Sequence, residues 1–331
     1  MIRRATKNDL DAIDRLAERA IKAMQGAKIH QWDFSYPRKP HFFNDVEKER
    51  LYVFESNAGI LGVMAILEDE PLYDVIDWHR QGALVIHRMI VGPDAQRQGV
   101  ASAMMMHAIA MAKNRGKKAI HIDTHPGNPR MKNFLRKHQF HYRGYLKSIH
   151  RLAYERLVDF SHVRRVSIFG SSGTGKTTLA RMVGAKFNLP VLHLDTIYWK
   201  QNWTSLSKPE FKRRIRAYMR AHPRFVMDGN YTNSQTFEDR LKISDTLILL
   251  RYDTRQALKG ILEREAEYKH RYRSDMATGC IEDVDQEFLQ YVAFFHKKKL
   301  KIEGLLNQLR DTKTILIFDN REALQYWLDS I

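Results

Sequence analysis

Cysteine is nearly absent from this chain of 331 residues, which contains Cys280 and no other. A single cysteine excludes an internal disulfide framework and is typical of proteins in a reducing compartment. Long apolar segments are lacking as well: no run reaches the roughly 18 residues of a membrane span. Residues 1–6 lack the apolar stretch of a secretory signal. We therefore expect a cytoplasmic globular protein.

Acidic residues are in the minority, with 38 Asp and Glu against 55 Lys and Arg, which gives a net charge of +17. The excess is spread along the chain: residues 1–160 contain 26 basic and 18 acidic side chains, and residues 161–331 contain 29 and 20. Two interpretations stay open, because a basic surface suits either polyanionic cofactors or a nucleic acid. The length favours two domains, each large enough for its own core.

The most specific motif begins in the middle of the chain, where residues 170–177 are Gly-Ser-Ser-Gly-Thr-Gly-Lys-Thr. An apolar run before it predicts a strand, and a helix is expected after it. Glycines let consecutive backbone N–H groups turn toward a β-phosphate, and the helix N-terminus adds a positive potential. Lys176 is expected to reach the β- and γ-phosphates of ATP, and the Thr177 hydroxyl to bind Mg²⁺. The residues expected to bind the nucleotide are Gly170, Ser171, Ser172, Gly173, Thr174, Gly175, Lys176, Thr177 and Thr178.

Short apolar runs after this loop alternate with helical patterns. This alternation predicts an α/β domain around a parallel sheet, with functional side chains at the carboxyl ends of the strands. Asp195 and Asp228 follow two of the runs and are candidate catalytic residues. Each either holds magnesium-bound water or accepts a substrate proton, or it caps the next helix. The expected strands cover residues 190–194, 224–227, 246–250 and 314–318.

Arginines are frequent from residue 240 onward and are candidates for contacts with substrate or for a lid over the phosphates. Guanidinium groups would there neutralise a transferring phosphoryl group. The alternative for each is a solvated basic helix face. The candidates are Arg240, Arg264, Arg271 and Arg273.

Residues 163–307 together resemble the small P-loop kinases known as DNA topology modulation proteins, which are relatives of adenylate and shikimate kinases. The resemblance rests on the phosphate loop, on residues 193–203, on the Val226–Tyr231 segment and on residues 273–280. Ser274 stands where the family usually has proline. The resemblance implies phosphoryl transfer from ATP, with Mg²⁺, to a small acceptor.

The first half of the chain predicts a separate domain of mixed α+β type. Its strand at 83–91 runs into Gln96-x-x-Gly99-x-Ala101, where a helix is expected to begin and continue to about residue 114. Backbone N–H groups from Arg97 to Ser102 can then surround a pyrophosphate. The other expected elements are strands at 2–5 and 119–123, a helix at 10–24, and hairpins at 51–55 with 60–67 and at 145–148 with 151–157.

These features resemble the GNAT N-acetyltransferases across nearly all of residues 1–157. The resemblance implies that the loop holds the pyrophosphate of acetyl-CoA, that the preceding strand pairs with the pantetheine arm, and that an amine accepts the acetyl group. His87-Arg88 and Asp123 are further residues that match the GNAT family. The residues implied in acetyl-CoA binding are Met89, Ile90, Val91, Gln96, Arg97, Gln98, Gly99, Val100, Ala101, Ser102 and Asn128.

One position departs from the GNAT pattern. Members commonly carry a Tyr in the helix after Asn128, which protonates the departing thiolate, and Leu135 stands at the matching position here. A leucine cannot donate a proton, so the acid is absent or replaced. His125, His138 and Tyr142 are neighbouring candidates for it.

The candidate general base is Glu68, at the end of the 60–67 strand, where several GNAT members place a water-linked carboxylate. The alternative is a solvated loop acid. Trp32 and Tyr36 either line the acceptor pocket or pack in the core. The histidines show no metal-ligand spacing, so no metal is expected beyond the Mg²⁺ of the nucleotide.

We thus expect two domains, residues 1–158 and 163–331, joined without a Gly-, Ser- or Pro-rich linker. The combined expectation is a bifunctional transferase acting on small molecules, with acetyl-CoA, ATP and Mg²⁺. Two alternatives stay open. One is a nucleic-acid-directed protein, which acetylates an aminoacyl-tRNA or a basic protein or binds DNA or RNA. The other is a regulatory protein that senses its cofactors. Neither acceptor follows from the sequence.

Overall fold

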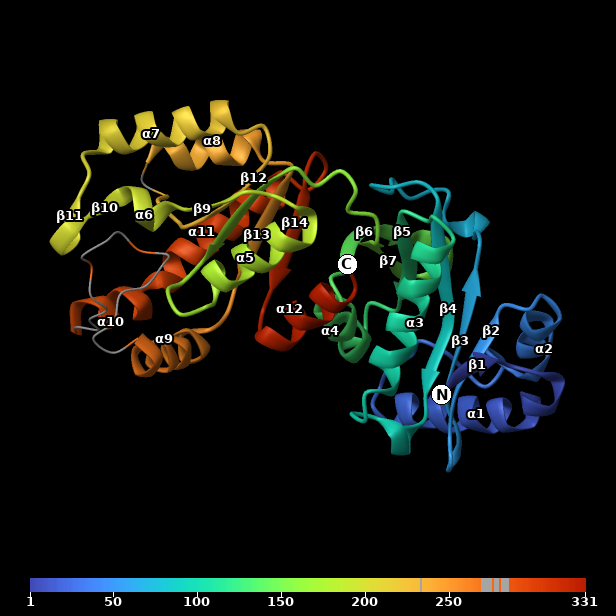
Figure 1. Ribbon diagram of the computed structural model, residues 1–331. Coiled ribbons are helices and arrows are strands. Elements are labelled where there is room, and N and C mark those ends of the chain that lie inside the picture. The colour runs from blue at the N-terminus through green and yellow to red at the C-terminus, as the bar shows by residue number, and fades with distance from the viewer. Residues whose placement is uncertain (233, 269–275, 277–279, 281–285) are drawn as a thin grey trace. The chain divides into compact units, whose positions relative to one another are not determined.

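The computed structural model describes residues 1–232, 234–268, 276, 280 and 286–331. The chain divides into two compact units (Figure 1): unit 1 is Met1–Phe160 with Tyr326–Ile331, and unit 2 is Ser161–Gln325. The break near residue 160 lies close to the expected one, whereas Tyr326–Ile331 group with unit 1 and not with the second domain. Within unit 1, the ring of Trp327 meets that of Phe160 edge-on, with centroids 5.8 Å apart.

Unit 1 is built around a mixed sheet of seven strands in the order β1-β2-β3-β4-β5-β7-β6. Every neighbouring pair is antiparallel except β4 and β5, which are parallel. The strands are β1 (Ile2–Arg4), β2 (Leu51–Ser56), β3 (Gly59–Leu67), β4 (Ala83–Val91), β5 (Ala119–Thr124), β6 (His141–Leu146) and β7 (Arg151–Leu157), and the helices are α1 (Leu10–Gly26), α2 (Lys39–Glu47), α3 (Val100–Asn114) and α4 (Pro129–Lys137).

Hydrophobic cores form on both faces of this sheet, because successive strand residues point to opposite sides. Val63 packs with Leu16 of α1 in one core, and its neighbour Met64 packs with Met104 of α3 in the other. The apolar spacing that predicted the first helix is that of its buried face, which consists of Leu10, Ile13, Leu16, Ala17, Ala20 and Ile21.

The last hairpin of unit 1 differs from the expected one. Strand β6 begins at His141 and not at residue 145, and its register with β7 shifts between Tyr142 and Gly144. A bulge in a half-exposed strand interrupts the alternation of apolar and polar residues that reveals a strand in the sequence. The other expected strands of this unit lie within two residues of the observed ones.

The central strands β4 and β5 separate after four residue pairs, of which Ile86 with Ile122 is the last. Arg88 has a φ of 50° in the middle of β4, and the register of β4 with β3 shifts nearby. Such a bulge bends a strand and leaves backbone groups unpaired. In the described part of the chain, the β5-facing edge of Met89–Val91 therefore has no strand partner.

Unit 2 contains five parallel strands in the order β14-β13-β8-β12-β9. The expected strand at 190–194 is shorter, because the chain turns into a helix at Leu194, and a small hairpin that was not expected follows. The strands are β8 (Arg165–Gly170), β9 (Val191–His193), β12 (Phe225–Asp228), β13 (Thr246–Leu250) and β14 (Thr314–Phe318), with β10 (Trp199–Lys200) and β11 (Thr204–Ser205) in the hairpin. The helices are α5 (Lys176–Phe187), α6 (Leu194–Tyr198), α7 (Lys208–Ala221), α8 (Gln235–Ile243), α9 (Thr254–Tyr268), α10 (Gln286–Ala293), α11 (Phe295–Gln308) and α12 (Arg321–Asp329), which continues into unit 1 from Tyr326 onward.

The strand order of unit 2 reverses beside its central strand. The chain leaves β8 toward β9 on one side, returns to β12, and then crosses over β8 to β13 and β14 on the other side. Ligands of open parallel sheets bind at the carboxyl ends of the strands at such a switch point. The loop 170–177 follows β8 at this place. No helix in the described ranges is both long and apolar enough to span a bilayer.

Candidate functional site

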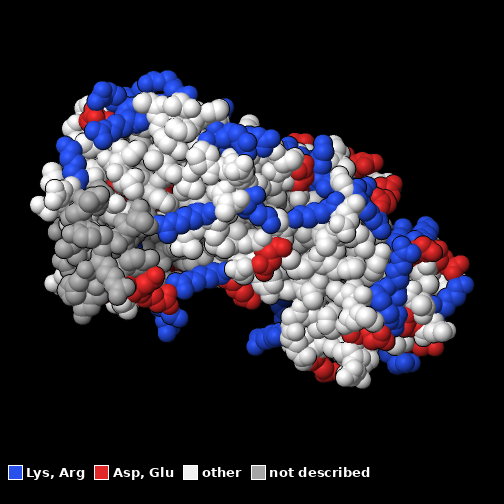
Figure 2. Space-filling view, viewed as in Figure 1, with Lys and Arg blue, Asp and Glu red and all other residues white. Residues whose placement is uncertain are grey.

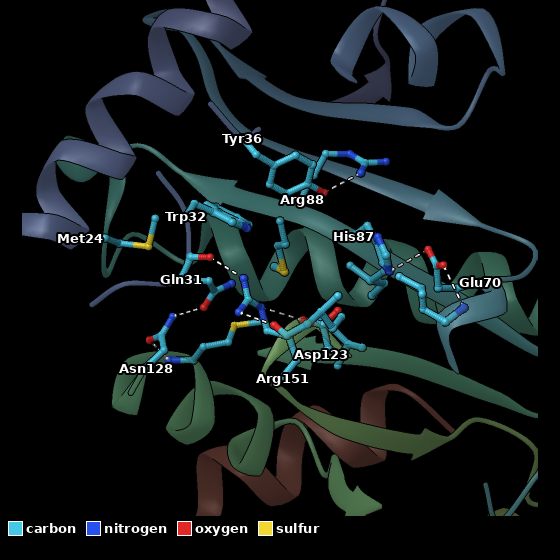
Figure 3. Close-up of a pocket in the computed structure, with 16 residues that line it drawn as sticks. Met24, Gln31, Trp32, Tyr36, Glu70, His87, Arg88, Asp123, Asn128 and Arg151 are labelled. Atoms are coloured by element: carbon cyan, nitrogen blue, oxygen red, sulfur yellow. Dashed lines mark hydrogen bonds and ion pairs between the residues drawn. The ribbon is translucent and has the colours of Figure 1, made fainter. Parts of the chain in front are cut away.

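Unit 1 contains a cavity of about 540 Å³ beside the point where β4 and β5 separate (Figure 3). Of the sequence candidates, Trp32, Tyr36, Met89 and Asn128 line this cavity. Its complete lining is Met24, Gln31, Trp32, Tyr36, Glu70, Leu72, Ile86, His87, Arg88, Met89, Ile122, Asp123, Asn128, Met131, Ile149 and Arg151.

The Tyr36 hydroxyl is held by Arg88, whose Nη1 donates a hydrogen bond of 2.8 Å to it. The other side of the guanidinium is bound to Asp45, with Nε 2.6 Å from Oδ2 and Nη2 2.8 Å from Oδ1. Asp45 has no exposed surface and also accepts a hydrogen bond from Arg50. A bidentate pair of this kind fixes a guanidinium strongly. The bulge in β4 thereby aims Arg88 at the tyrosine in the cavity wall.

Asp123 lies at the end of β5 and accepts a hydrogen bond of 2.7 Å from the Tyr73 hydroxyl. Its other carboxylate oxygen lies 3.5 Å from Nε of Arg151. Burial raises the pKa of Asp123 above its ordinary value, and the nearby Glu70 carboxylate adds to this rise, while Tyr73 and Arg151 oppose it. The carboxylate is therefore incompletely compensated by its neighbours.

His87 faces Glu70 across the cavity wall, with Nε2 of the ring 3.5 Å from Oε2 of the carboxylate (Figure 3). Although this distance meets the usual ion-pair limit, Nε2 is buried without a hydrogen-bond partner among the described residues. Burial, with the charge of Arg88 next in importance, lowers the pKa of His87 to about 4. The imidazole is consequently neutral at physiological pH and has a free lone pair.

Gln31 and Asn128 form the part of the cavity wall next to α4. The Gln31 side-chain oxygen accepts hydrogen bonds from Asn128 (2.7 Å) and from the Thr124 hydroxyl (3.0 Å). The Asn128 oxygen accepts from the backbone N–H of Met131 and so caps α4. Asn128 thus has a clear structural role as a helix cap, whatever it contacts in a complex.

Glu68, the candidate base, lies outside the cavity lining. Its carboxylate binds Arg115 and Lys117, each at 2.5 Å, and its side chain is 54% exposed. Lys117, followed by Arg115, lowers the pKa of Glu68. Glu68 is therefore the solvated acid. The acid that lines the cavity is Glu70, two residues later.

The loop from Gln96 to Ser102 lies at the N-terminus of α3. Gly99 caps the helix with a φ of 81°, and a Cβ built there would meet nothing within 4 Å. The first N–H groups of a helix have no partner within it, so those of α3 are available to an anion. The Ser102 hydroxyl lies 3.1 Å from Nε2 of His138.

None of the three neighbours proposed to replace the missing acid lines the cavity, and Leu135 is fully buried in the α3 core. Burial lowers the pKa of His138 to about 3, so that its ring is neutral. Tyr142 is 54% exposed, and His125 accepts a hydrogen bond from the backbone of Gly127. Among the residues that line the cavity, Tyr36 is the one that carries a phenol.

Unit 2 holds the loop of residues 170–177 at the carboxyl end of β8. Its glycines are required by the backbone: Gly173 has a φ of 77°, and a Cβ there would lie 2.1 Å from the carbonyl oxygen of Ala257 in α9. Lys176 bends back to donate a hydrogen bond of 2.9 Å to the carbonyl of Ser171. The Ser171 hydroxyl is buried and has no hydrogen-bond partner in the described part of the chain. The loop therefore presents polar groups that a phosphate would satisfy.

Asp228 connects this loop to the neighbouring strands. Its Oδ2 accepts a hydrogen bond of 2.9 Å from the Thr177 hydroxyl, and its Oδ1 lies 2.6 Å from Nδ1 of His193. Asp228 and His193 are register partners at the ends of β12 and β9, so the sheet brings them together. Asn230 adds two hydrogen bonds to the backbone of Gly170.

Asp195 does not share this network. It lies in the first turn of α6, and its Oδ1 accepts a hydrogen bond of 2.5 Å from the Tyr231 hydroxyl. Burial, followed by the charge of Asp195, raises the pKa of Tyr231. The two candidate carboxylates of unit 2 thus have different surroundings, since Asp228 is joined to the phosphate loop and Asp195 to an aromatic cluster with Tyr198 and Phe211.

The arginine candidates have different positions. Arg240 is fully buried, donates to the carbonyls of Gly229 and Asn230, and lies over the ring of Phe169, so it supports the β12 loop and is no lid residue. Arg264 lies in α9 over the ring of Phe288. Arg271 and Arg273 lie outside the described residues.

Several residues of these sites were not singled out from the sequence, although one signal was available. Asp45 shares the buried face of α2 with Phe42, and an acid on an apolar helix face calls for a partner. His193 and Asn230 lie in the segments 193–203 and Val226–Tyr231 on which the kinase resemblance rests, but the sequence assigned neither of them a role. Glu70 carries no local signal, because the fold alone places it. No group of His, Cys, Asp and Glu with the geometry of a metal centre occurs within the described ranges.

Residues 17–140 fit the protein family described as acetyltransferase (GNAT) family. No curated protein matches the chain. Similar solved structures include a candidate acetyltransferase from Staphylococcus aureus Mu50, with 31% identity, 48% of this chain and 99% of that chain covered, and a TM-score of 0.39. A GNAT acetyltransferase from Streptococcus agalactiae 2603 has 23% identity, 47% and 94% coverage and a TM-score of 0.41. The PaiA N-acetyltransferase from Thermoplasma acidophilum, solved with coenzyme A, has 14% identity, 47% and 98% coverage and a TM-score of 0.39.

The family match covers the strands that separate, the loop at Gly99 and the cavity lining except Ile149 and Arg151. Unit 2 lies outside these residues, and its α/β architecture rests on its five-stranded parallel sheet. Residues 17–140 are therefore a GNAT acetyltransferase domain, followed in the chain by a second domain of α/β type.

Proposed function

We propose that unit 1 transfers the acetyl group of acetyl-CoA to a small amine, and that unit 2 transfers the γ-phosphoryl group of ATP to a small acceptor. The observation that carries the first activity is the separation of β4 and β5 next to the cavity. An extended ligand pairs with an unpaired strand edge through backbone hydrogen bonds. The edge of Met89–Val91 offers such a site to the pantetheine arm, and the N-terminus of α3 offers one to the pyrophosphate.

Acetyl transfer requires an amine that has lost its proton. An alkylammonium with a pKa near that of lysine, about 10.4, is almost entirely charged at pH 7. In the proposed reaction the amine enters as the free base after losing this proton to water, and the neutral His87 ring accepts a hydrogen bond from the amine nitrogen. The amine nitrogen then attacks the thioester carbonyl, a C–N bond forms, and the C–S bond breaks.

The departing sulfur needs a proton, and Tyr36 is positioned to supply it. Its hydroxyl lines the cavity and accepts a hydrogen bond from Arg88, which leaves its own proton free for another partner. The adjacent guanidinium also stabilises the phenolate that remains. Tyr36 would thus serve in place of the acid that Leu135 cannot provide.

Acetyl transfer is tested by titrating the full chain with acetyl-CoA in a calorimeter and by following thiol release with a panel of amines. Binding together with amine-dependent thiol release supports the proposal. Binding without release for any amine points to a sensor and not an enzyme.

The second activity is supported by the bond from Thr177 to Asp228, which joins the loop after β8 to the end of β12 at the switch point of the sheet. The residues present fit a nucleotide with its magnesium ion: Thr177 and Asp228 would hold the ion, and the backbone from Gly170 to Gly175 would surround the phosphates. When bound, Mg²⁺ offsets negative charge on the phosphate oxygens. Lys176 would leave the Ser171 carbonyl to contact the transferred group.

Small molecules are the proposed partners of both units. Lys and Arg side chains on the visible face form several separate groups with Asp and Glu among them (Figure 2). A polynucleotide requires a continuous basic surface, and on this face acidic side chains stand among the basic ones (Figure 2). Phosphoryl transfer is tested by incubating the chain with ATP, Mg²⁺ and a panel of hydroxyl compounds, with mass spectrometry as the readout.

A further inference from the structure

The charged groups that line the cavity of unit 1 differ in how many hydrogen bonds they form within the protein. Two are cationic, Arg88 and Arg151, and two are acidic, Glu70 and Asp123 (Figure 3). A simple count gives no net charge. Which charge is available to a ligand therefore depends on how well each group is already paired within the protein.

Both arginines are already bonded to anionic or polar partners within the protein. Arg88 binds Asp45 through Nε and Nη2 and the Tyr36 hydroxyl through Nη1. Arg151 donates from Nη2 to the backbone carbonyl of Gln31 at 2.5 Å and from Nη1 to the carbonyls of Ile149 and His150. A ligand carboxylate would compete with these partners for guanidinium groups whose charge is already partly balanced.

The two carboxylates are held more weakly. Glu70 receives one backbone hydrogen bond of 3.3 Å, from Leu72, and faces a neutral histidine ring. Asp123 receives one from the Tyr73 hydroxyl, and its contact with Arg151 is long, at 3.5 Å. Both side chains are only 16% exposed, so few water molecules can donate the hydrogen bonds that the protein does not provide. A cationic ligand would complete the coordination of both.

Apolar side chains separate and surround these charges. Trp32, Met24 and Ile149 belong to the same lining, and Ile86 and Ile122 close it on the sheet side. This part of the wall suits a short hydrocarbon chain. The cavity therefore combines two anionic points with an apolar interior.

From this arrangement we propose that the acetyl acceptor of unit 1 is a small aliphatic diamine, with Asp123 binding the ammonium group that is not acetylated. This inference rests on the proposed acetyl transfer and names its substrate class. The reacting amine lies toward His87 and Glu70 as the free base, its proton lost to water, and the acetyl group moves from sulfur to nitrogen as the C–N bond forms and the C–S bond breaks. The second ammonium keeps its charge throughout and pairs with Asp123.

The experiment compares three acceptors of similar length that differ in the charge at their far end: 1,4-diaminobutane, n-butylamine and 4-aminobutanoate. The full chain is supplied with acetyl-CoA, and kcat/KM is measured for each. A hydrogen bond to a charged group contributes about 1.5–3 kcal/mol, so the diamine should exceed butylamine by roughly 10- to 100-fold. The amino acid should be the poorest acceptor.

The matched variants are Asp123→Asn and Asp69→Asn. Asp123→Asn should reduce the ratio of diamine to butylamine activity to near one, whereas Asp69→Asn, an exposed acid outside the cavity lining, should keep the ratio of the native chain. Because Asp123 is buried and its variant can fail to fold, acetyl-CoA binding by that variant is measured alongside, and the native chain's preference among the three acceptors stands as an independent test.

The outcomes separate this inference from the proposed function. Equal or better activity with butylamine or 4-aminobutanoate overturns the diamine assignment and leaves acetyl transfer standing. An unchanged ratio in a folded Asp123→Asn variant also overturns it. Absence of both acetyl-CoA binding and thiol release removes the proposed function, and the diamine assignment with it.

Discussion

Arg88 donates a hydrogen bond of 2.8 Å from Nη1 to the hydroxyl of Tyr36, while the other side of its guanidinium is clamped on the buried carboxylate of Asp45. This relationship depends on the bulge in β4, since Arg88 has a positive φ there. The same bulge coincides with the separation of β4 from β5. One local irregularity thus opens the strand edge for a cofactor and fixes a phenol in the cavity beside it.

Tyr36→Phe should lower kcat for acetyl transfer by about 100-fold, because loss of a general acid typically costs at least that much. KM for acetyl-CoA should change little, since the ring remains. The change is measured as the rate of thiol release at saturating acetyl-CoA and amine. Tyr142→Phe, which alters an exposed phenol outside the cavity, serves as the control. A Tyr36→Phe chain with native kcat would exclude Tyr36 as the acid.

Gly99→Glu should weaken acetyl-CoA binding by more than about tenfold, since a carboxylate would stand at the proposed pyrophosphate position. Calorimetric titration gives the dissociation constant. Gly116→Glu is the matched control: it also has a positive φ, of 64°, and open space around its Cβ, but it lies beyond the other end of α3. Equal losses in both variants would attribute the effect to backbone strain.

Lys176→Ala should reduce ATP turnover by roughly 100-fold or more, because it removes the cation that contacts the transferring phosphoryl group. Acetyl-CoA binding should be unaffected, since Lys176 and the loop at Gly99 belong to different units. The readouts are phosphate release and calorimetry on the same preparation. Lys186→Ala, on an exposed position near the end of the same helix, should leave both unchanged. Loss of acetyl-CoA binding in a folded Lys176→Ala chain would contradict independent sites.

Much of this arrangement follows from sequence patterns, and the remainder depends on contacts between distant residues. The bounds of β4 and the loop at Gly99 were predicted, because apolar runs and glycine positions are local signals. The bulge at Arg88 was not, since nothing in its neighbours requires a positive φ. Glu68 and Glu70 are equally acidic in the sequence, and only the ion pairs with Arg115 and Lys117 distinguish the solvated residue.

Acid should destabilise unit 1 because His87 and His138 are buried as neutral rings, with pKa values lowered to about 4 and about 3. An unfolded chain binds a proton at each of them below pH 6.5, while the folded chain does not until the pH is far lower. Their stabilising contribution is therefore complete above pH 6.5 and lost as the pH falls toward 4. Each of the two histidines should therefore lower the free energy of unfolding by about 2 kcal/mol when the pH falls from 7 to 5.

Urea unfolding followed by circular dichroism at pH 7, 6 and 5 measures this dependence. His138→Gln should reduce the number of protons taken up on unfolding by about one, and so flatten the change of unfolding free energy with pH. His30→Gln, at an exposed position, should leave that change as it is in the native chain. A native chain whose unfolding free energy is the same at pH 7 and pH 5 would contradict the burial of neutral rings.

Mass spectrometry of 1,4-diaminobutane, after incubation with the full chain and acetyl-CoA, shows whether acetyl-CoA meets an amine in the cavity beside β4 and β5. We expect a singly acetylated diamine, formed by the native chain and not by Gly99→Glu. Native acetyl-CoA binding with no acetylated amine, or equal product from Gly99→Glu, would contradict this expectation.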